Sequence, residues 1–456
     1  MRLSAVEQRP RPRTIYTQLC FCYDVPHGRM HEQILERLHQ GLKHLTSFVP
    51  WVAGQVVEDE GVFSVAPLDN VPRLTSRDFT TENSMPTMQQ LKDAKFPFNM
   101  LDEKLICPRN TLSDGPNQDD THPYPVLLLQ ANFVRGGMLL TILTCHSVMD
   151  IVGQVQIIKL LSKACNGEAP TDVEIADCNM DRQHLIPVLD DKEREAGKDL
   201  VIARPVLPVT SPSSPQSVPT APKLRWAYFQ FSDDALRTLK SLATSTLPES
   251  VPFVSTDDCI CALLWQSLAR VCLARLDSAA HLHFSRQADV RKYMNVPATY
   301  PGNMVASVNT ALTLTELTTE SLGTLAFKMR ALLVPEVLVY TLRDGAIVPE
   351  DRRTQEKQEA WNQEQKQYRD NKRIYRENTI IMSSWTKADC NDVNFNLGLG
   401  KPVAVRRPMF TPYEGVVYLL PKGRDGEILA GWCLCEEDID GLRKDEEFCK
   451  WAEYIG

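Results

Sequence analysis

Residues 144–153 read Thr-Cys-His-Ser-Val-Met-Asp-Ile-Val-Gly, and this stretch decides how the rest of the chain is interpreted. The apolar run that ends at Cys145 predicts a strand, and apolar residues of 151–165 recur at helical spacing. His146 therefore falls where a strand turns into a helix, a position from which a side chain can project into a cleft. An imidazole with the ordinary pKa of about 6.5 can accept a proton at neutral pH. Taken alone, a His followed four residues later by Asp is a weak signal, and a structural histidine is the more ordinary explanation.

The sequence before this stretch predicts further strands and one long helix. Leucines in 33–46 recur at helical spacing, so we expect a helix there. The apolar runs 126–130 and 138–145 predict two strands, and the Arg-Gly-Gly at 135–137 predicts the hairpin turn between them. The first part of the chain thus mixes strands and helices, as an α/β domain does.

The sequence changes character at residues 204–222, which hold six prolines and many Ser and Thr residues. Such a stretch sustains neither a helix nor a central strand. We interpret residues 201–225 as a crossover linker between a first domain, 1–200, and a second domain, 226–456.

The second half repeats the alternation of strands and helices. It predicts a strand at 226–231 and helices at 232–244, 257–273 and 436–454. The segment 342–378 is highly charged, and we expect it to be solvated. We therefore expect two α/β units.

Composition excludes several classes of protein. The chain has 456 residues, 43% of them hydrophobic and 24% charged, with a formal net charge of −8. A nucleic-acid binder needs a basic face, which this balance does not favour. No apolar run reaches the length of about 18 residues that a membrane helix needs. The first residues contain no apolar segment typical of a secretory signal, so we expect a cytoplasmic protein.

Thirteen cysteines are scattered along the chain, and three pairs have one residue between them: Cys20 and Cys22, Cys259 and Cys261, Cys433 and Cys435. Residues two apart on a strand share a face, so such pairs could imitate metal ligands. No Cys-x-x-Cys spacing is present, and the surrounding sequence is apolar. Buried free thiols in a reducing compartment are the better interpretation, and we expect no metal site.

Several other motifs follow the His146 stretch in a fixed order. They are Ser255-Thr256-Asp257-Asp258 with Ala262 and Trp265, Asp289-Val290-Arg291 with Tyr300-Pro301-Gly302-Asn303, Ser383-Ser384-Trp385, the segment 394–402, and Leu420-Pro421 with Asp425-Gly426. Together with His146, Asp150 and Gly153, this ordered set resembles the BAHD acyltransferases over nearly the whole chain. Within that family, the text at 50–56, 160–165, 254–258 and 397–402 most resembles the fungal trichothecene 3-O-acetyltransferases.

The resemblance implies a fold and an activity. It implies two similar chloramphenicol-acetyltransferase-like α/β domains with a tunnel between them, and His146 midway along that tunnel as the general base. Acetyl-CoA would be the co-substrate, no cofactor would be bound permanently, and the acceptor would be a small-molecule alcohol, a hydroxylated fungal secondary metabolite such as a terpenoid. We expect a monomer, with no nucleic acid as partner. Two alternatives stay open: an N-acyltransferase or longer-chain acyl-CoA user on this fold, and a catalytically silent ligand-binding homologue.

The resemblance also assigns roles around His146. Asp150 would turn away from the substrate and pair with Arg291, so that its role is structural support of the catalytic loop. Cys145 is adjacent to His146, but neighbouring residues of a strand point to opposite faces. We therefore expect direct transfer without an acyl-enzyme on Cys145.

Two further groups of residues are candidates on weaker grounds. Contacts near the coenzyme A tunnel are assigned to Ser255, Thr256, Ser383, Ser384 and Lys401, although helix capping and strand hydrogen bonds explain each of them equally well. The glycine-rich segment departs from the family, because Asn stands where most members have Asp, at Asn394 or, in a second alignment, at Asn396. The family's tryptophan is then replaced by a leucine in a motif that consists of Leu397, Gly398, Leu399 and Gly400. This motif is mainly structural in the family, so we expect activity to survive the change.

Overall fold

The computed structural model describes residues 1–9, 15–26, 31–68, 72–82, 84–112, 123–200, 222–247, 253–346, 359 and 378–456. Nearly all of the predicted linker, 201–225, lies outside this part of the chain. The same is true of 347–358 and 360–377 in the predicted charged segment.

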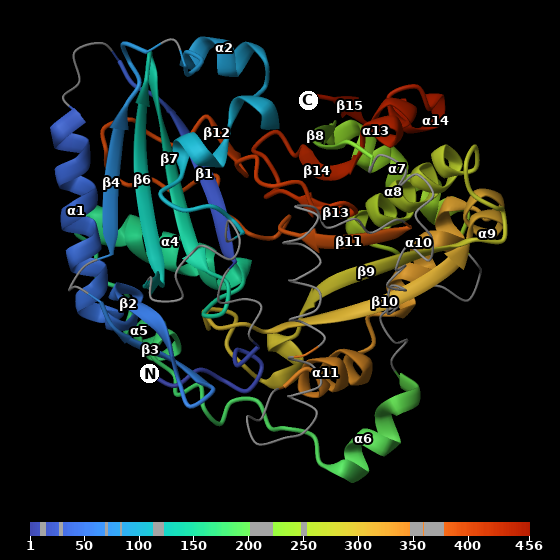
Figure 1. The fold of residues 1–456 in the computed structure, drawn as a ribbon, viewed down its shortest axis with the longest axis horizontal. Coiled ribbons are helices and arrows are strands. Elements are labelled where there is room, and N and C mark those ends of the chain that lie inside the picture. The colour runs from blue at the N-terminus through green and yellow to red at the C-terminus, as the bar shows by residue number, and fades with distance from the viewer. Residues whose placement is uncertain are drawn as a thin grey trace, which may run out of the picture.

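The first large sheet has five strands and belongs mainly to the N-terminal half. Its order is β12 (Ala404–Arg406), β1 (Tyr16–Asp24), β7 (Gly137–Cys145), β6 (Leu127–Val134) and β4 (Arg73–Asp78). Neighbouring strands are antiparallel except β4 and β6, which are parallel. In Figure 1 helices α1 (His31–Phe48) and α4 (Ile151–Cys165) lie together on one side of this sheet.

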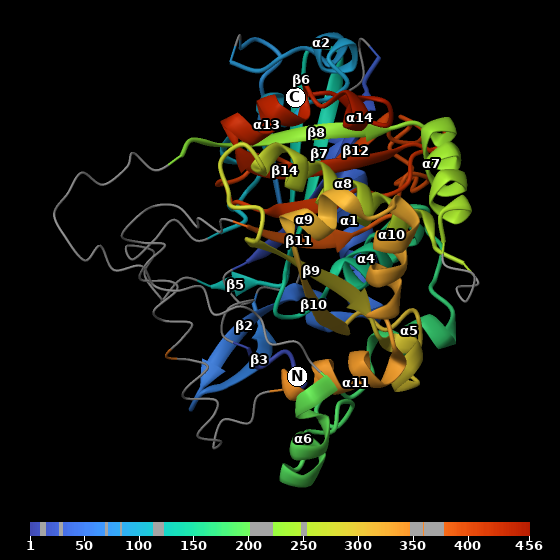
Figure 2. The same ribbon diagram turned by 90° about the vertical axis from the view of Figure 1, so that its right-hand side faces the viewer.

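The second large sheet has seven strands and is built from the C-terminal half. Its order is β10 (Val305–Thr313), β9 (His281–Asp289), β11 (Thr379–Ser384), β13 (Val416–Leu419), β14 (Ile428–Cys435), β8 (Leu224–Phe231) and β15 (Glu453–Tyr454). Figure 2 shows β10, β9, β11, β14 and β8 in this order from the middle of the molecule toward its top. One face packs against a layer of helices that includes α7 (Asp233–Ser245), α8 (Thr256–Cys272), α10 (Leu322–Ala331) and α13 (Glu436–Leu442).

Alternation along β11 shows what the other face of this sheet contacts. Ile380 and Met382 belong to the apolar cluster under the helices. Ile381 and, just past the strand, Trp385 belong instead to the cluster of the first sheet. Because successive side chains of a strand point to opposite faces, the second sheet presents one face to its helices and the other to the N-terminal half.

The two halves are also joined by exchange of a strand. β12 comes from the C-terminal half, yet it pairs with β1 of the N-terminal half at Cys20, Phe21 and Cys22. Figure 1 shows this orange-red segment entering the blue and green half. The joint between the two sheets is therefore held by backbone hydrogen bonds as well as by apolar packing.

The remaining elements are short. A third sheet contains β3 (Val62–Pro67), β2 (Gly54–Asp59) and β5 (Tyr124–Pro125). Short helices are α2 (Met88–Asp93), α3 (Glu103–Ile106), α5 (Asp172–Cys178), α6 (Asp191–Gly197), α9 (Leu314–Thr319), α11 (Pro335–Asp344) and α14 (Glu446–Cys449). Turns of 3₁₀ helix occur at Pro50–Ala53, Phe98–Met100, Lys198–Leu200 and Arg291–Met294.

The predicted helix over 436–454 is wrong as a single element. The segment forms α13 and α14, separated at Arg443–Asp445, and then turns into the edge strand β15. The carboxylate of Asp445 caps the start of α14. Tyr454 packs edge-on against Phe229, with ring centroids 5.7 Å apart. Pairing with β8 therefore determines that residues 453–454 form a strand and do not continue the helix.

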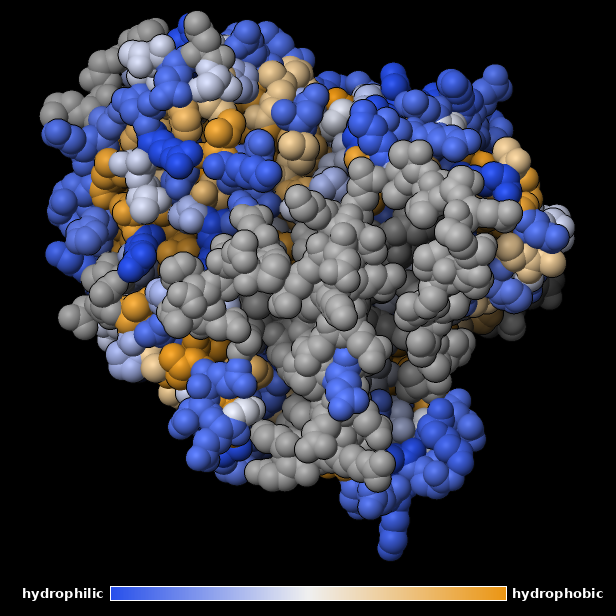
Figure 3. Space-filling view, viewed as in Figure 1, coloured by the Kyte–Doolittle hydropathy of each residue, from blue (hydrophilic) through white to orange (hydrophobic). Residues whose placement is uncertain are grey.

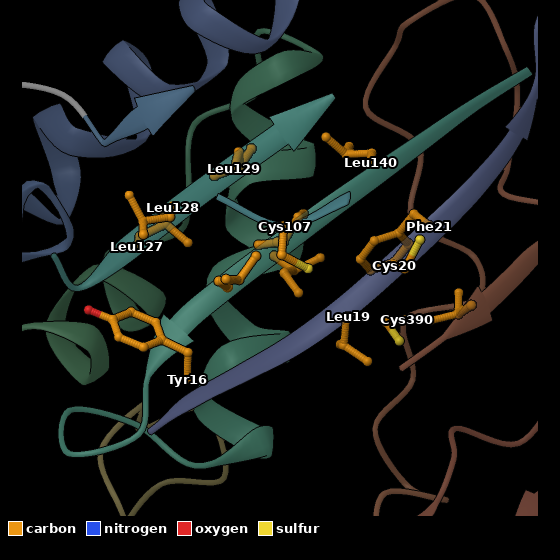
Figure 4. Close-up of a cluster of buried hydrophobic side chains, with 14 of the residues drawn as sticks. Tyr16, Leu19, Cys20, Phe21, Cys107, Leu127, Leu128, Leu129, Leu140 and Cys390 are labelled. Carbon is orange, nitrogen blue, oxygen red and sulfur yellow. The ribbon is translucent and has the colours of Figure 1, made fainter. Parts of the chain in front are cut away.

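The cysteines are part of the apolar core. All thirteen are free, and Cys449 alone among them is exposed. Figure 4 shows Cys20, Cys107 and Cys390 among the leucines of the first sheet. These thiols act as small apolar side chains in the packing.

The surface alternates polar and apolar patches. In Figure 3 hydrophilic side chains cover much of the described surface on this face, and apolar ones gather at the upper left, over the first sheet. Among the described residues, no helix has the length and the apolar character that crossing a membrane requires.

Candidate active site

His146 follows the last residue of β7, where the strand ends beside the C-terminal half. Its backbone N–H donates to the carbonyl of Ile15 at 2.9 Å, which extends the pairing of β7 with β1 by one residue. The side chain is half-buried, and its Nδ1 is fully buried without a hydrogen-bond partner among the described residues. Burial lowers the pKa of the imidazole, and the nearby Asp150 carboxylate offsets part of that effect. The ring is therefore neutral, and able to accept a proton, at neutral pH.

Asp150 is occupied entirely by structural contacts. Its carboxylate caps α4 by accepting from the Gly153 amide at 3.0 Å, and it also accepts from the Met304 amide at 3.0 Å. Nη2 of Arg291 donates to both carboxylate oxygens, at 2.8 and 2.9 Å, and both side chains are about 2% exposed. The contact that the resemblance implied between Asp150 and Arg291 is thus present, and it holds the start of α4 against the C-terminal half.

The segment 300–304 packs against the loop of residues 146–150, which carries His146. Arg291 donates through Nε to the carbonyl of Tyr300 at 3.0 Å and through Nη2 to that of Gly302 at 2.6 Å. Nδ2 of Asn303 donates to the carbonyls of His146 at 2.8 Å and of Ser147 at 3.1 Å. The backbone of His146 is therefore held on its amide side by Ile15 and on its carbonyl side by Asn303, a residue from the other half of the chain.

Gly153 makes this approach possible. A Cβ atom at that position would lie 1.8 Å from the carbonyl oxygen of Pro301. Because an amide carbonyl cannot yield that much space, a glycine is required for α4 to meet the segment 300–304. The glycine of the sequence motif is explained by packing rather than by chemistry.

Sequence reasoning missed a buried ion pair behind the loop. Nη1 of Arg182 donates to Glu7 at 2.8 Å and to the carbonyl of Val148 at 2.6 Å, and both charged side chains are fully buried. Glu7 also accepts from the Asn303 amide at 3.0 Å. The guanidinium stacks on Trp51 and on Tyr300, 4.7 and 5.6 Å from their centroids. No spacing or motif marks either residue, so only the folded chain reveals the pair.

Ser255, Thr256 and Ser384 gather at the start of α8, on the helix-covered face of the second sheet. Ser255 caps α8, Thr256 is the first residue of that helix, and Ser255 and Asp258 form a reciprocal capping box. Oγ of Ser384 donates to Asp257 at 2.6 Å. Both aspartates bind the buried Arg286, at 2.5 and 2.6 Å. These hydrogen bonds are the capping and strand contacts that the sequence left open as the alternative.

Ser383 and Lys401 lie elsewhere. Ser383 points to the opposite face from Ser384 and accepts from Trp385 Nε1 at 3.0 Å, beside Tyr418 of β13. Lys401 is exposed and pairs with Asp392 at 2.8 Å. The five candidates are thus spread over three places, and none of the hydrogen bonds among the described residues joins them to His146.

The glycine-rich segment anchors the far end of α4. The carbonyl of Asn394 accepts from Ser162 at 2.9 Å and from Asn166 at 2.7 Å. The side chain of Asn394 in turn accepts from the amide of Asn396 at 3.0 Å. Three residues have positive φ, Asn396, Gly398 and Gly400, and Leu397 is buried while Leu399 is half-buried. The neutral asparagine serves in a backbone turn, which needs no carboxylate.

Cys145 and metal ligands are the remaining chemical candidates. Burial raises the pKa of the Cys145 thiol, which lies 3.2 Å from Ser147 Oγ, so the reactive thiolate is disfavoured. Among the described residues, no group of three His, Cys, Asp or Glu side chains is arranged to hold a metal ion.

Comparisons with known proteins agree over the full length of the chain. Residues 15–165 match the trichothecene 3-O-acetyltransferase-like N-terminal domain family. The chain is 38% identical to trichothecene 3-O-acetyltransferase TRI101 of Fusarium sporotrichioides, covering 100% of this chain and 97% of that protein. It is 39% identical to the O-acetyltransferase dmxR13 of Cryptosporiopsis sp., covering 97% and 95%.

Solved structures give the same result. The chain is similar to F. graminearum TRI101 complexed with coenzyme A and deoxynivalenol, with a TM-score of 0.87, 36% identity, and coverage of 100% and 99%. Vinorine synthase, at 15% identity and a TM-score of 0.64 over 99% and 93% of the two chains, shares the fold.

Proposed function

Because this chain belongs to the trichothecene 3-O-acetyltransferase-like family and has the BAHD fold, we propose that His146 catalyses acetyl transfer from acetyl-CoA to a hydroxyl group of a fungal secondary metabolite. One observation carries the proposal. His146 is a half-buried imidazole with a lowered pKa, and its loop is clamped by the Asp150–Arg291 pair and Asn303.

The proposed reaction is a direct transfer. Neutral His146 accepts the proton of the acceptor hydroxyl while the oxygen attacks the thioester carbonyl carbon. The new C–O bond gives a tetrahedral oxyanion, which collapses as the C–S bond breaks. The proton held by His146 then passes to the departing thiolate, so that free coenzyme A and the acetyl ester leave. General-base catalysis contributes about 10²–10⁴-fold, and joint positioning of the substrates contributes much of the rest.

The surroundings of Cys145 support this route over an acyl-enzyme. An acyl-enzyme needs a reactive thiolate, whereas burial raises the pKa of this thiol. Cys145 is the last residue of β7 and His146 follows it directly. Because neighbouring residues of a strand point to opposite faces, we expect the thiol to point away from the imidazole. Asp150 supports the loop by geometry, since its carboxylate is shared among Arg291 and two backbone amides.

The proposal includes the domain organisation. We assign residues 1–200 and 226–456 to two acyltransferase domains, and we place the substrate tunnel between the two large sheets. Strand order supports this assignment, because apart from β12 each large sheet is built from one half of the chain. Twelve buried free thiols support a reducing compartment, the cytoplasm.

The test is release of coenzyme A thiol from acetyl-CoA with a panel of hydroxylated metabolites, a trichothecene alcohol among them. We expect His146→Ala to lower turnover by about 10²-fold or more without lowering the melting temperature. His281→Ala, which changes an exposed histidine of β9, is the matched control and should leave turnover unchanged.

Each alternative has its own outcome. Equal thiol release by wild type and His146→Ala would refute the proposed base. Preference for amines or for longer acyl-CoAs would favour the N-acyl or long-chain alternative on the same fold. Binding of coenzyme A without turnover of any alcohol or amine would favour a silent ligand-binding homologue.

A further inference from the structure

Arg407 is a buried cation without a carboxylate partner. It follows the last residue of β12 and is 2% exposed, yet no ion pair among the described residues includes it. Its backbone amide and carbonyl both bond to Tyr228 Oη, at 3.0 and 2.9 Å, but no hydrogen bond among those residues uses the guanidinium. Nε is fully buried and unpaired. Buried polar groups are nearly always satisfied, so a buried guanidinium that has no ion pair among these residues and an unpaired Nε needs an explanation.

Aromatic packing explains only part of the environment of Arg407. The guanidinium carbon lies 4.4 Å from the ring centroids of Phe410 and Tyr418 and 5.4 Å from that of Trp385. Rings stacked in this way stabilise the cation through its faces. The N–H bonds lie in the plane of the guanidinium, so they need oxygen acceptors at its edge.

Strand directions place Arg407 at the same end of the sheet as His146. β12 and β7 are both antiparallel to β1, so both strands lead the chain toward one edge of the sheet. Arg406 pairs with Cys20, and Cys145 pairs with Tyr16. The residues that follow are therefore separated by four positions along β1, roughly 13 Å along the strand at about 3.3 Å per residue.

Because β12 and β7 flank β1 on opposite sides, the two residues are also separated by two strand spacings, about 10 Å across the sheet. The Arg407 charge contributes to lowering the pKa of His146, which agrees with a common buried environment. The Arg407 charge also lowers the pKa of Glu103, although burial of that carboxyl raises its pKa overall. The Glu103 carboxylate already accepts from Gln18 at 2.9 Å and from the Thr111 amide at 2.6 Å, and it forms no ion pair with Arg407.

We propose that Arg407 binds a carbonyl or carboxylate oxygen of the acceptor molecule, and so selects alcohols that carry such an oxygen about one ring system away from the acetylated hydroxyl. This inference rests on the proposed acetyl transfer at His146. A compact acceptor suits an enclosure of three aromatic rings, because its rings pack there while one oxygen meets the guanidinium edge. The strongly hydrated phosphates of coenzyme A do not suit such an enclosure.

The test uses three matched benzyl alcohols that differ in the meta substituent: 3-(hydroxymethyl)benzoate, its methyl ester, and 3-methylbenzyl alcohol. Binding is measured by isothermal titration in the presence of coenzyme A, and acetylation by thiol release. Variants are Arg407→Gln, Arg407→Lys and the control Arg406→Gln. Arg406 is the adjacent arginine, whose guanidinium already donates to the carbonyls of Val405 and Lys95.

We expect wild type to bind the carboxylate or the ester at least tenfold more tightly than the methyl compound. Arg407→Gln should lose this preference, Arg407→Lys should keep a preference for the carboxylate only, and Arg406→Gln should behave as wild type. Preference for the carboxylate alone in wild type would identify a charged acceptor, and equal preference for the ester would identify a neutral carbonyl.

The absence of any preference in wild type, or the same preference in Arg407→Gln, would overturn the inference. A tenfold rise in the KM for acetyl-CoA in Arg407→Gln, with acceptor preference unchanged, would also overturn it by assigning Arg407 to the donor. If Arg407→Gln does not fold, wild type and Arg407→Lys decide the question. Wild type could also bind the carboxylate or the ester preferentially and yet release no thiol. That result would contradict the proposed acetyl transfer but would still support the Arg407 site.

Discussion

The chemistry of His146 depends on burial more than on any partner. Its Nδ1 has no hydrogen-bond partner among the described residues, and the two nearby charges act in opposite directions on its pKa. Asp150 raises the pKa, whereas Arg407 lowers it together with burial. The imidazole is thus kept in the neutral form that can accept a proton.

This balance predicts the pH dependence of catalysis. Because burial lowers the pKa of His146 below the usual value of about 6.5, we expect kcat/KM to be constant near neutrality and to fall at more acidic pH. Arg407→Gln removes a positive charge that lowers this pKa, so the pKa rises and the acidic limb moves to higher pH. The measurement is kcat/KM of thiol release between about pH 5 and pH 9.

Arg406→Gln serves as the control and should leave the acidic limb in place. A wild-type limb above the usual histidine pKa would contradict the lowered value. A limb that moves to lower pH in Arg407→Gln would contradict the sign of the charge effect.

At the scale of elements, the junction between β7 and α4 positions His146, the proposed base. Asp150 caps α4, pairs with Arg291 and accepts from the Met304 amide. The loop that carries His146 is therefore fixed at one end by β7 and at the other by a charged contact with the second half.

Removing the Asp150 carboxylate should destabilise this junction. We expect Asp150→Ala to lower the free energy of unfolding by about 3 kcal/mol, since it leaves a buried guanidinium without its main partner and α4 without its cap. Asp289 is the matched control, because it binds the same Arg291 at 2.8 Å but its side chain is 46% exposed. Asp289→Ala should cost less than about 1 kcal/mol.

Urea unfolding and thiol release, measured on both variants, separate structure from chemistry. Loss of turnover should follow loss of stability in Asp150→Ala. A variant that melts like wild type but is inactive would show that Asp150 takes part in the reaction directly.

On the scale of the whole molecule, the first residues of the chain reach the loop that carries His146. Met1 and Leu3 hydrogen-bond to Val65 and Phe63 of β3. That contact brings Glu7 to Arg182, which in turn holds the carbonyl of Val148. The N-terminal segment is thus part of the support of the site.

Neutralising Glu7 should weaken that support. Glu7→Gln leaves the buried Arg182 charge uncompensated, so we expect it to lower the free energy of unfolding by about 3 kcal/mol and to reduce kcat. Lys95→Gln is the control, because Lys95 and Glu453 form an exposed pair between distant segments. It should cost less than about 1 kcal/mol.

Chemical denaturation and initial rates on both variants test this prediction. Equal stabilities of Glu7→Gln and Lys95→Gln would show that the buried pair contributes no more than a surface pair. If Glu7→Gln is destabilised but its kcat is unchanged, Arg182 contributes to stability without positioning the loop that carries His146.

Local pattern was enough to predict the elements around the site. The predicted helix 151–165 is α4 with the same bounds, and the strands that meet at residues 135–137 are β6 and β7. Hydrophobic periodicity acts within a few residues, so it can be read from the sequence alone. The end of the chain differs, because Tyr454 joins a sheet edge that only the folded protein provides.

The sequence by itself determined the family and the elements that carry His146, the proposed base, because these depend on the order and spacing of neighbouring residues. Only the tertiary structure decided which charges are buried and what they meet. Asp150 finds Arg291 across 141 positions, Glu7 finds Arg182 across 175, and nothing in the sequence distinguishes Arg407 from Arg406. Burial and pairing of charge depend on how segments distant in the sequence pack together, and such packing produces no periodic pattern in the sequence.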